Sequence, residues 1–260
     1  AGLTGGVLVR IGDVDAGTLA ALARDGRFLV QGLDPQPETV EAVRRDLLTR
    51  GRLGPVTVKR LESDRLPYPN DFVTCILAAG REPVPRKELL RVLRPGGLYL
   101  RVADGRWQAE TKPADPRTDA WTHFLYDATN NAVSGDRRLG PVNTLQWVAR
   151  PRWSRSHDQF PSTTVMVSDN GRLFNISDRG PAAYSHLPPD WTLEARDAYS
   201  GTVLWQRPMP DWFDHQYLFR SGPNQLMRRL VAVDDTVAVT LGLTAPVSVL
   251  DGATGQTLRT

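Results

Sequence analysis

The sequence predicts a protein in two parts, an α/β domain followed by an all-β region. Three observations support this division. The first hundred residues alternate between short apolar runs and helical patterns, which is typical of a parallel sheet with helices on its faces. From about residue 105 the chain becomes rich in Pro, Asp, Asn and Gly, which predicts an irregular connector. After residue 145 only strand patterns remain.

Five β-rich runs divide the first domain. They are VLVRI (7–11), RFLVQG (27–32), PVTVKRL (55–61), FVTCILA (72–78) and GLYLRV (97–102). The clearest helix follows Pro37, a residue favoured in the first helical turn. Val40, Val43 and Leu47 then recur at helical spacing, and Gly51 offers a C-terminal cap. The alternation of these elements predicts a parallel sheet.

The all-β region contains an internal repeat. Two hairpin patterns, TTVMVSDNGRLFNIS (163–177) and RRLVAVDDTVAVTLG (228–242), are each followed by a turn of the form Asp-x-x-Ser/Thr-Gly. In these turns Asp197, Ser200 and Gly201 correspond to Asp251, Thr254 and Gly255. Repeats of four short strands are typical of propeller blades. We therefore expect domain boundaries at 1–104 for the α/β domain, 105–147 for the connector and 148–260 for two blades of an incomplete propeller.

Composition excludes several classes of protein. Hydrophobic residues make up 40% and charged residues 23% of the chain, which is typical of a globular protein and not of a disordered one. The net charge of +3 comes from scattered arginines, so no clustered nucleic-acid footprint is expected. No apolar run is long enough to span a membrane. Cys75 is the single cysteine, and we expect a buried structural thiol.

The first domain resembles the class I S-adenosylmethionine-dependent methyltransferases. The resemblance rests on the strand-turn-helix GVLVRIGDVDAG, on the acid in VQGLDPQPETV, on LESDRLPYPNDFVTCIL and on LLRVLRPGGLYL. It implies a Rossmann-like, methyltransferase-type parallel sheet. It also implies that Gly12, Asp34, Glu62 and Ser63 contact the cofactor, with Asp34 on the ribose and Glu62 beside the adenine.

Each of these positions also has a structural explanation. Gly12 fits any turn that leaves a strand, because glycine tolerates positive φ. Asp34, directly before Pro35, is equally suited to capping the following helix. Glu62 and its neighbours are equally suited to a solvated loop.

The family pattern has glycines near positions 14 and 16, where this chain has Val14 and Ala16. A β-branched residue does not readily adopt positive φ, so we expect the turn either to change course or to fill the cofactor pocket. These departures predict a degenerate domain. An active methyltransferase is the alternative.

The second part resembles the pyrroloquinoline-quinone-like β-propellers with tryptophan-docking repeats, through ARDAYSGTVLW (195–205). The resemblance implies that Trp205 packs between neighbouring blades. Arg259 stands at the matching position of the second copy. These residues are architectural, so pyrroloquinoline quinone is not expected in this fragment, and a quinoprotein dehydrogenase is the weaker alternative.

Two loops of the second part combine polar and aromatic residues, PRWSRSHDQFPS (151–162) and WTHFLYDATNN (121–131). Each is compatible with a polar ligand site or with hydrogen bonds that tie the connector to the first blade. The four histidines lie too far apart in sequence for a local metal signature, so no metal site is expected.

A methyltransferase-like domain followed by quinoprotein-like blades resembles large planctomycete-type β-propeller repeat proteins. The resemblance implies an exported, periplasmic protein with little access to S-adenosylmethionine. The sequence begins without Met and stops within a repeat, which predicts a piece of a longer chain that supplies the remaining blades. The leading hypothesis is a degenerate methyltransferase-like domain joined to a propeller that binds a protein or polymer partner.

Overall fold

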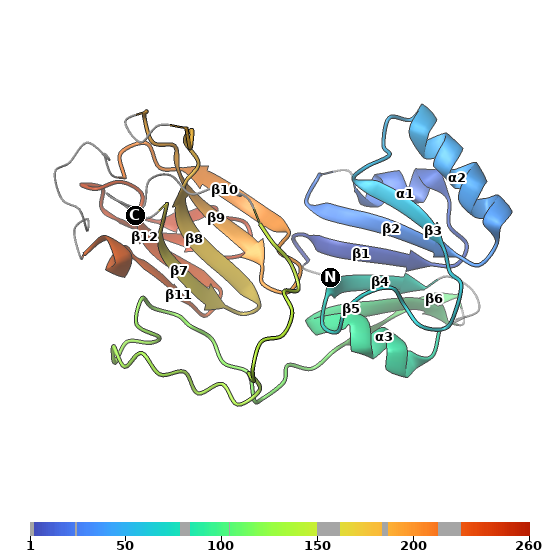
Figure 1. Ribbon diagram of the computed structural model, residues 1–260, viewed down its shortest axis with the longest axis horizontal. Coiled ribbons are helices and arrows are strands. Elements are labelled where there is room, and N and C mark those ends of the chain that lie inside the picture. The colour runs from blue at the N-terminus through green and yellow to red at the C-terminus, as the bar shows by residue number, and fades with distance from the viewer. Residues whose placement is uncertain are drawn as a thin grey trace. The chain divides into compact units, whose positions relative to one another are not determined.

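The computed structural model divides the chain into two compact units, Ala1–Asp115 and Pro116–Thr260, and each is described by itself (Figure 1). The structure describes residues 3–23, 25–78, 84–103, 105–149, 162–183, 187–212 and 225–260. Within these ranges, none of the helices combines the length and the apolar character that a membrane crossing requires.

Six strands form one mixed sheet in the first unit, in the order β3-β2-β1-β4-β5-β6. Strands β1 to β5 run parallel to their neighbours, and β6 is antiparallel to β5. The strands are β1 Gly6–Ile11, β2 Phe28–Asp34, β3 Val56–Arg60, β4 Val73–Ala78, β5 Leu93–Ala103 and β6 Arg106–Thr111. Each of the five predicted runs overlaps one parallel strand, which confirms the predicted sheet. The order is that of a Rossmann-like, doubly wound fold.

Helices α1 (Ala16–Leu22) and α2 (Pro37–Thr49) cover one face of this sheet (Figure 1). Pro37 stands in the first turn of α2, as predicted, and Gly51 follows its end with a φ of 62°. Buried side chains of the two helices share a core with β2 and β3; they are Leu19, Val40, Val43 and Leu47, packed with Val30, Val56 and Val58. The helical spacing therefore fixed which side of α2 faces the sheet.

Helix α3 (Arg86–Val92) lies on the opposite face, together with the segment 61–72 that joins β3 to β4. This segment is irregular, and α3 holds it in place. Arg91 donates hydrogen bonds to the carbonyl oxygens of Leu66 and Tyr68, at 3.2 and 2.9 Å. The N–H of Leu66 donates to Glu88 at 2.7 Å. Leu66 is thereby buried in the core on this face.

Strand β6 occupies the first part of the expected connector. The sequence predicted irregular chain from residue 105, but Arg106–Thr111 pair with β5 as an antiparallel edge strand. Most side chains of β6 are exposed. An exposed edge strand lacks the apolar content that marks a buried strand in sequence, which explains the difference.

The second unit contains two four-stranded antiparallel sheets, in the orders β10-β9-β8-β7 and β11-β12-β13-β14. Their elements are β7 Thr163–Asp169, β8 Arg172–Asp178, β9 Trp191–Asp197, β10 Val203–Pro208, the 3-10 helix η1 Leu226–Arg229, β11 Leu230–Val233, β12 Thr236–Thr240, β13 Val247–Asp251 and β14 Thr257–Arg259. Both predicted hairpins and both following strand pairs are present. The two sheets share one hydrophobic core.

The two predicted turns have the same geometry. The carboxylate of Asp197 accepts hydrogen bonds from the N–H and the hydroxyl of Ser200, each at 2.8 Å. Asp251 does the same with Thr254, each at 2.7 Å. The internal repeat is therefore present in the structure as well as in the sequence.

Two tryptophans each lie against the glycine of one of these turns. The indole N–H of Trp147 donates to the carbonyl oxygen of Ala198 at 3.0 Å, beside Gly201. The indole N–H of Trp205 donates to the carbonyl oxygen of Gly252 at 3.0 Å, beside Gly255. Trp205 thereby connects the first sheet to the second.

Candidate functional site

The carboxyl edge of the parallel strands brings the predicted site positions together. The N–H of Gly12, after β1, donates to the carbonyl oxygen of Leu33 in β2 at 2.9 Å. The N–H of Leu61, after β3, donates to the carbonyl oxygen of Asp34 at 2.9 Å. Gly12, Asp34 and Glu62 therefore stand on three neighbouring strand ends, as the sequence predicted. Ligands of doubly wound sheets bind at this edge.

The turn after β1 places two consecutive residues in the left-handed region. Gly12 has a φ of 72° and Asp13 a φ of 45°. Val14 escapes that conformation, and its side chain is buried in the core between the sheet and helices α1 and α2. One of its methyl groups packs over Gly32 of β2. Val14 is therefore part of the core, and Ala16 is likewise buried as the first residue of α1.

Arg10 of β1 ties this turn down. Its guanidinium donates to the carbonyl oxygen of Asp13 at 2.5 Å. It also lies 3.8 Å from the carboxylate of Asp13 and 3.7 Å from that of Asp15. The Nε atom of Arg10 is buried and has no hydrogen-bond partner in the described part of the chain. An arginine within an apolar strand is unusual. Its position in VLVRI was therefore the sequence feature that could have identified Arg10 as a residue of this site.

Asp15 closes the other end of the turn. Its carboxylate accepts a hydrogen bond from the N–H of Thr18 at 2.7 Å and caps helix α1. That hydrogen bond is the main cause that lowers the pKa of the Asp15 carboxyl below its ordinary value. Side chains in and beside the turn therefore satisfy some of its backbone groups: Arg10 binds the carbonyl oxygen of Asp13, and Asp15 binds the N–H of Thr18.

Asp34 behaves as a turn residue. One of its carboxylate oxygens accepts the N–H of Gln36 at 2.9 Å, just before α2 begins. The residue is only 5% exposed. Gln36 occupies the N-cap position of α2 without a side-chain cap hydrogen bond, so the Asp34 contact belongs to the turn before the helix and is not a helix cap. The contact uses one of the two carboxylate oxygens.

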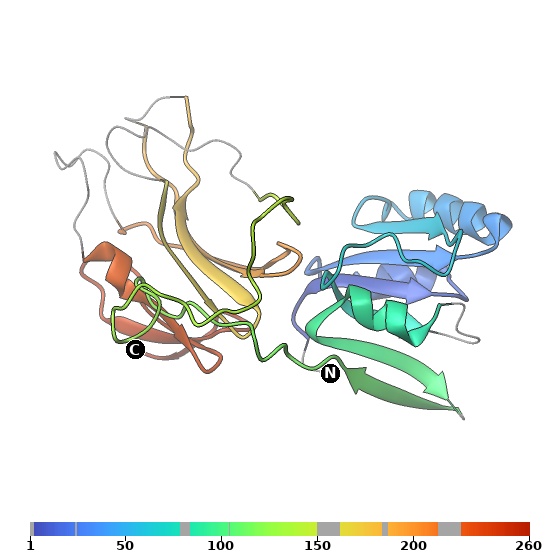
Figure 2. The ribbon, with the colours of Figure 1, turned by 60° about the horizontal axis from the view of Figure 1, so that its bottom comes forward.

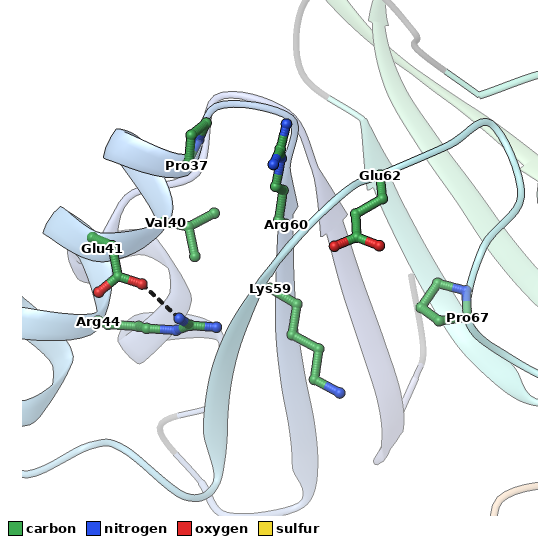
Figure 3. Close-up of a pocket in the computed structure, with 8 residues that line it drawn as sticks. All are labelled: Pro37, Val40, Glu41, Arg44, Lys59, Arg60, Glu62 and Pro67. Carbon is green, nitrogen blue, oxygen red and sulfur yellow. Dashed lines mark hydrogen bonds and ion pairs between the residues drawn. The ribbon is translucent and has the colours of Figure 1, made fainter.

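Glu62 lines a cavity of about 510 Å³ between α2 and the segment after β3 (Figure 3). The lining residues are Pro37, Val40, Glu41, Arg44, Lys59, Arg60, Glu62 and Pro67. Lys59 and Glu62 reach into this space, whereas Arg44 is engaged with Glu41 at 2.6 Å (Figure 3). Gly12 and Asp34 do not line this cavity.

Ser63, which the resemblance also assigned to cofactor binding, is exposed and forms a local turn. Its hydroxyl lies 3.3 Å from both the carbonyl oxygen and the nitrogen of Arg65. Ser63 is not among the residues that line the cavity beside Glu62. The four predicted positions thus share one edge of the sheet without sharing one cavity.

In the second unit, the segment 121–131 ties the connector to the sheets. The N–H of Ser168 in β7 donates to the carbonyl oxygen of Trp121 at 2.7 Å. The N–H of Ala232 in β11 donates to the carbonyl oxygen of Thr122 at 3.0 Å. One of the two explanations given by the sequence for this segment was that hydrogen bonds attach it to the first blade, and the bond to Ser168 is of that kind. The other polar loop, 151–162, lies outside the described residues except for Ser162.

The strand order and the helices on both faces define the class of the first unit, a Rossmann-like α/β sheet. No protein-family model matches the chain, and no curated protein matches it. Among solved structures, the chain is similar to an S-adenosylmethionine-dependent methyltransferase from Aquifex aeolicus, with 25% identity and a TM-score of 0.35. That alignment covers 39% of this chain and 57% of that one.

The names of two further similar structures give other activities. Geranyl diphosphate C-methyltransferase from Streptomyces coelicolor A3(2), solved with S-adenosyl-L-homocysteine, is 17% identical with a TM-score of 0.35, over 38% of this chain and 39% of that one. The cyclase SpnF is 23% identical with a TM-score of 0.34, over 37% of this chain and 38% of that one. This chain therefore spans less than two thirds of each of the three structures.

Two groups that S-adenosylmethionine would meet at this edge already make hydrogen bonds within the protein. One oxygen of the Asp34 carboxylate accepts the N–H of Gln36, and Arg10 donates to the carbonyl oxygen of Asp13 in the turn after β1. The acid that would lie beside the adenine borders a cavity from which Gly12 and Asp34 are absent.

Proposed function

We propose that the first unit is a methyltransferase-like domain retained for its shape, and that it does not bind S-adenosylmethionine. One observation supports this proposal above the others. The turn after β1 is closed from within, because Arg10 holds the carbonyl oxygen of Asp13 and lies near two carboxylates, while Asp15 caps α1. A helix N-terminus binds an anionic group of a ligand through its free N–H groups, and here Asp15 already accepts the N–H of Thr18.

An active methyltransferase is the alternative, favoured by the placement of Gly12, Asp34 and Glu62 on adjacent strand ends. In that case the Asp34 carboxylate would bind the ribose hydroxyls in addition to the N–H of Gln36. The chemistry would depend mainly on holding the methyl donor and acceptor in line.

Isothermal titration calorimetry of the full chain with S-adenosylmethionine distinguishes the two. We expect no binding heat at about 1 mM cofactor, a concentration at which a Kd of about 10 µM would saturate the site. Micromolar binding that disappears in the Asp34→Ala variant would contradict the proposal. Asp64→Ala is the matched control, because Asp64 is an exposed acid of the same edge. Circular dichroism of each variant establishes that it is folded.

We propose that the second unit acts as a surface for binding or assembly, built from two propeller-type sheets. The repeated turns and the tryptophan seated on each turn glycine support this role. Two sheets do not close a ring, since even small propellers have about four. Negative-stain electron microscopy of the assembled protein should show rings of such sheets. Isolated pairs of sheets would contradict this part of the proposal.

A further inference from the structure

The two edge strands of the first unit's sheet differ in how their backbone groups are satisfied. At the β3 edge, Arg44 donates two hydrogen bonds to the carbonyl oxygen of Val58, at 3.3 and 3.2 Å. The carbonyl oxygen of Val56 accepts the N–H of Gly54, and the N–H of Val56 donates to Arg52. The Arg44 side chain and the turn before β3 thus occupy backbone groups of this edge, which hinders its pairing with another strand.

The β6 edge has no comparable protection in the described part of the chain. Just after β6, the N–H of Lys112 donates inward to the carbonyl oxygen of Gly97. Along an antiparallel strand such groups alternate, so the backbone groups of Trp107, Ala109 and Thr111 point away from β5. No described hydrogen bond ends on these outward groups. Figure 2 shows β6 as the outermost arrow of its sheet.

An apolar surface adjoins this edge. Trp107 stands opposite Val102 of β5, and Ala109 stands opposite Leu100, so these four side chains share one face of the sheet. Trp107 is 64% and Val102 42% exposed. An exposed edge strand beside exposed apolar residues is a template for pairing with another chain.

We propose that β6 pairs antiparallel with β6 of a second copy of this chain, with Gln108 opposite the partner's Gln108. A two-fold axis through this point makes the strand its own complement. Arg106 then stands opposite the partner's Glu110, and Trp107 stands over the partner's Ala109. The outward groups of Trp107 meet those of the partner's Ala109, so the hydrogen-bonding alternation of both strands is kept.

Charge selects this register over its neighbours. Centring the pair on Ala109 would place Arg106 opposite the partner's Lys112, which is a like-charge contact. Centring it on Trp107 would oppose two tryptophans and leave Arg106 opposite a glutamine. In the proposed register each Glu110, already paired with Arg86 of its own chain, gains a second guanidinium from the partner's Arg106.

Disulfide trapping tests the register. Opposite residues that are not hydrogen-bonded in an antiparallel pair have Cα atoms about 4.5 Å apart, within reach of a disulfide. Gln108→Cys should therefore cross-link into a covalent dimer under mild oxidation. Thr111→Cys is the matched control, because it would lie about 20 Å from its counterpart in the partner. The native Cys75 is buried and does not compete.

Sedimentation velocity over increasing concentration tests the dimer itself. We expect the 28.8 kDa chain to form a dimer with a Kd on the order of 10–100 µM, because a single strand and its flank form a small interface. Ala109→Pro removes one outward N–H and should weaken the dimer at least tenfold. Arg106→Glu should also weaken the dimer, because residue 106 would then lie opposite the partner's Glu110, which has the same charge. This variant tests the proposal even if Ala109→Pro does not fold.

Several outcomes would overturn this proposal. A chain that stays monomeric at every concentration would do so, whether β6 is covered by another part of the chain or by nothing. So would a dimer that survives both Ala109→Pro and Arg106→Glu, or cross-linking that is equal in the two cysteine variants.

Discussion

Glu88 joins helix α3 to a segment that lies more than twenty residues earlier in the chain. One of its carboxylate oxygens accepts the N–H of Leu66 at 2.7 Å. Both oxygens also accept hydrogen bonds from Arg91, at 2.8 and 2.7 Å. The segment that crosses this face of the sheet therefore depends on one carboxylate and one guanidinium.

This relationship predicts a pH dependence of stability. Hydrogen bonds from Arg91 hold the pKa of the Glu88 carboxyl below its ordinary value of 4.5. Because the unfolded chain then binds the proton more tightly, the contribution of Glu88 is fully present above about pH 4.5. It is lost as the pH falls through the lower pKa of the folded state.

We expect Glu88→Gln to lower the free energy of unfolding by about 1–2 kcal/mol at neutral pH, as for a hydrogen bond to a charged group. The difference from the native chain should shrink below about pH 4.5. Urea unfolding at a series of pH values measures both. Glu62→Gln, an exposed carboxylate, should change stability by less than about 0.5 kcal/mol. A pH-independent difference for Glu88→Gln would count against this assignment.

Val14→Gly would restore the glycine of the family pattern, yet we expect it to be harmful. Val14 is buried between β2 and α1, so its removal leaves a cavity and a more flexible chain. The free energy of unfolding should fall by about 2–3 kcal/mol. Asp13→Gly is the matched control, because Asp13 is exposed and already has positive φ. Urea unfolding compares the two. Equal stability of Val14→Gly and the native chain would place Val14 outside the core.

Gly255→Ala should destabilise the second unit through two effects. Gly255 has a φ of 73°, which disfavours any Cβ, and that Cβ would lie 2.6 Å from the indole ring of Trp205. We expect a loss of about 3 kcal/mol, the sum of backbone strain and overpacking. Gly51→Ala has similar positive φ but meets no atom within 4 Å, so it should cost only the strain, about 1 kcal/mol. Thermal unfolding of both variants measures the two losses of stability. Equal losses would show that the indole ring of Trp205 moves aside and would contradict the overpacking.

Cys75 should be unreactive in the folded protein. Burial raises the pKa of its thiol to about 12, so almost no thiolate is present near pH 8. We expect no reaction with Ellman's reagent in native buffer, and one thiol per chain once guanidinium chloride has unfolded the protein. Rapid native-state reaction would show that β4 opens far more often than its buried position implies.

Most of the fold was predictable because its signals are local. The valines of α2 repeat at 3.6-residue spacing, and Asn170-Gly171 marks a hairpin, so neither needs tertiary information. Strand β6 was not predictable in this way. Its sequence, RWQAET, lies at an edge where only one face has apolar neighbours.

The strand ends that carry the candidate site residues were predictable from the sequence, but the hydrogen bonds and packing of these residues were not. The spacing of Gly12, Asp34 and Glu62 placed them on one edge, because parallel strands end together. Which way Val14 and the Asp34 carboxylate face depends on the turn's dihedral angles and on Arg10, which no periodicity describes. The family resemblance led to the expectation that the turn either changes course or fills the cofactor pocket, and the structure shows Val14 in the core beside Gly32.

The tryptophan on each turn glycine has a consequence for how the second unit unfolds. Trp205 belongs to one repeat and the glycine it covers belongs to the next, so this contact links modules instead of completing either one. In repeat proteins, contacts between neighbouring repeats add to the stability of each repeat. Because the two sheets also share one hydrophobic core, damage at the Trp205 contact should loosen both sheets together and should not release one sheet alone.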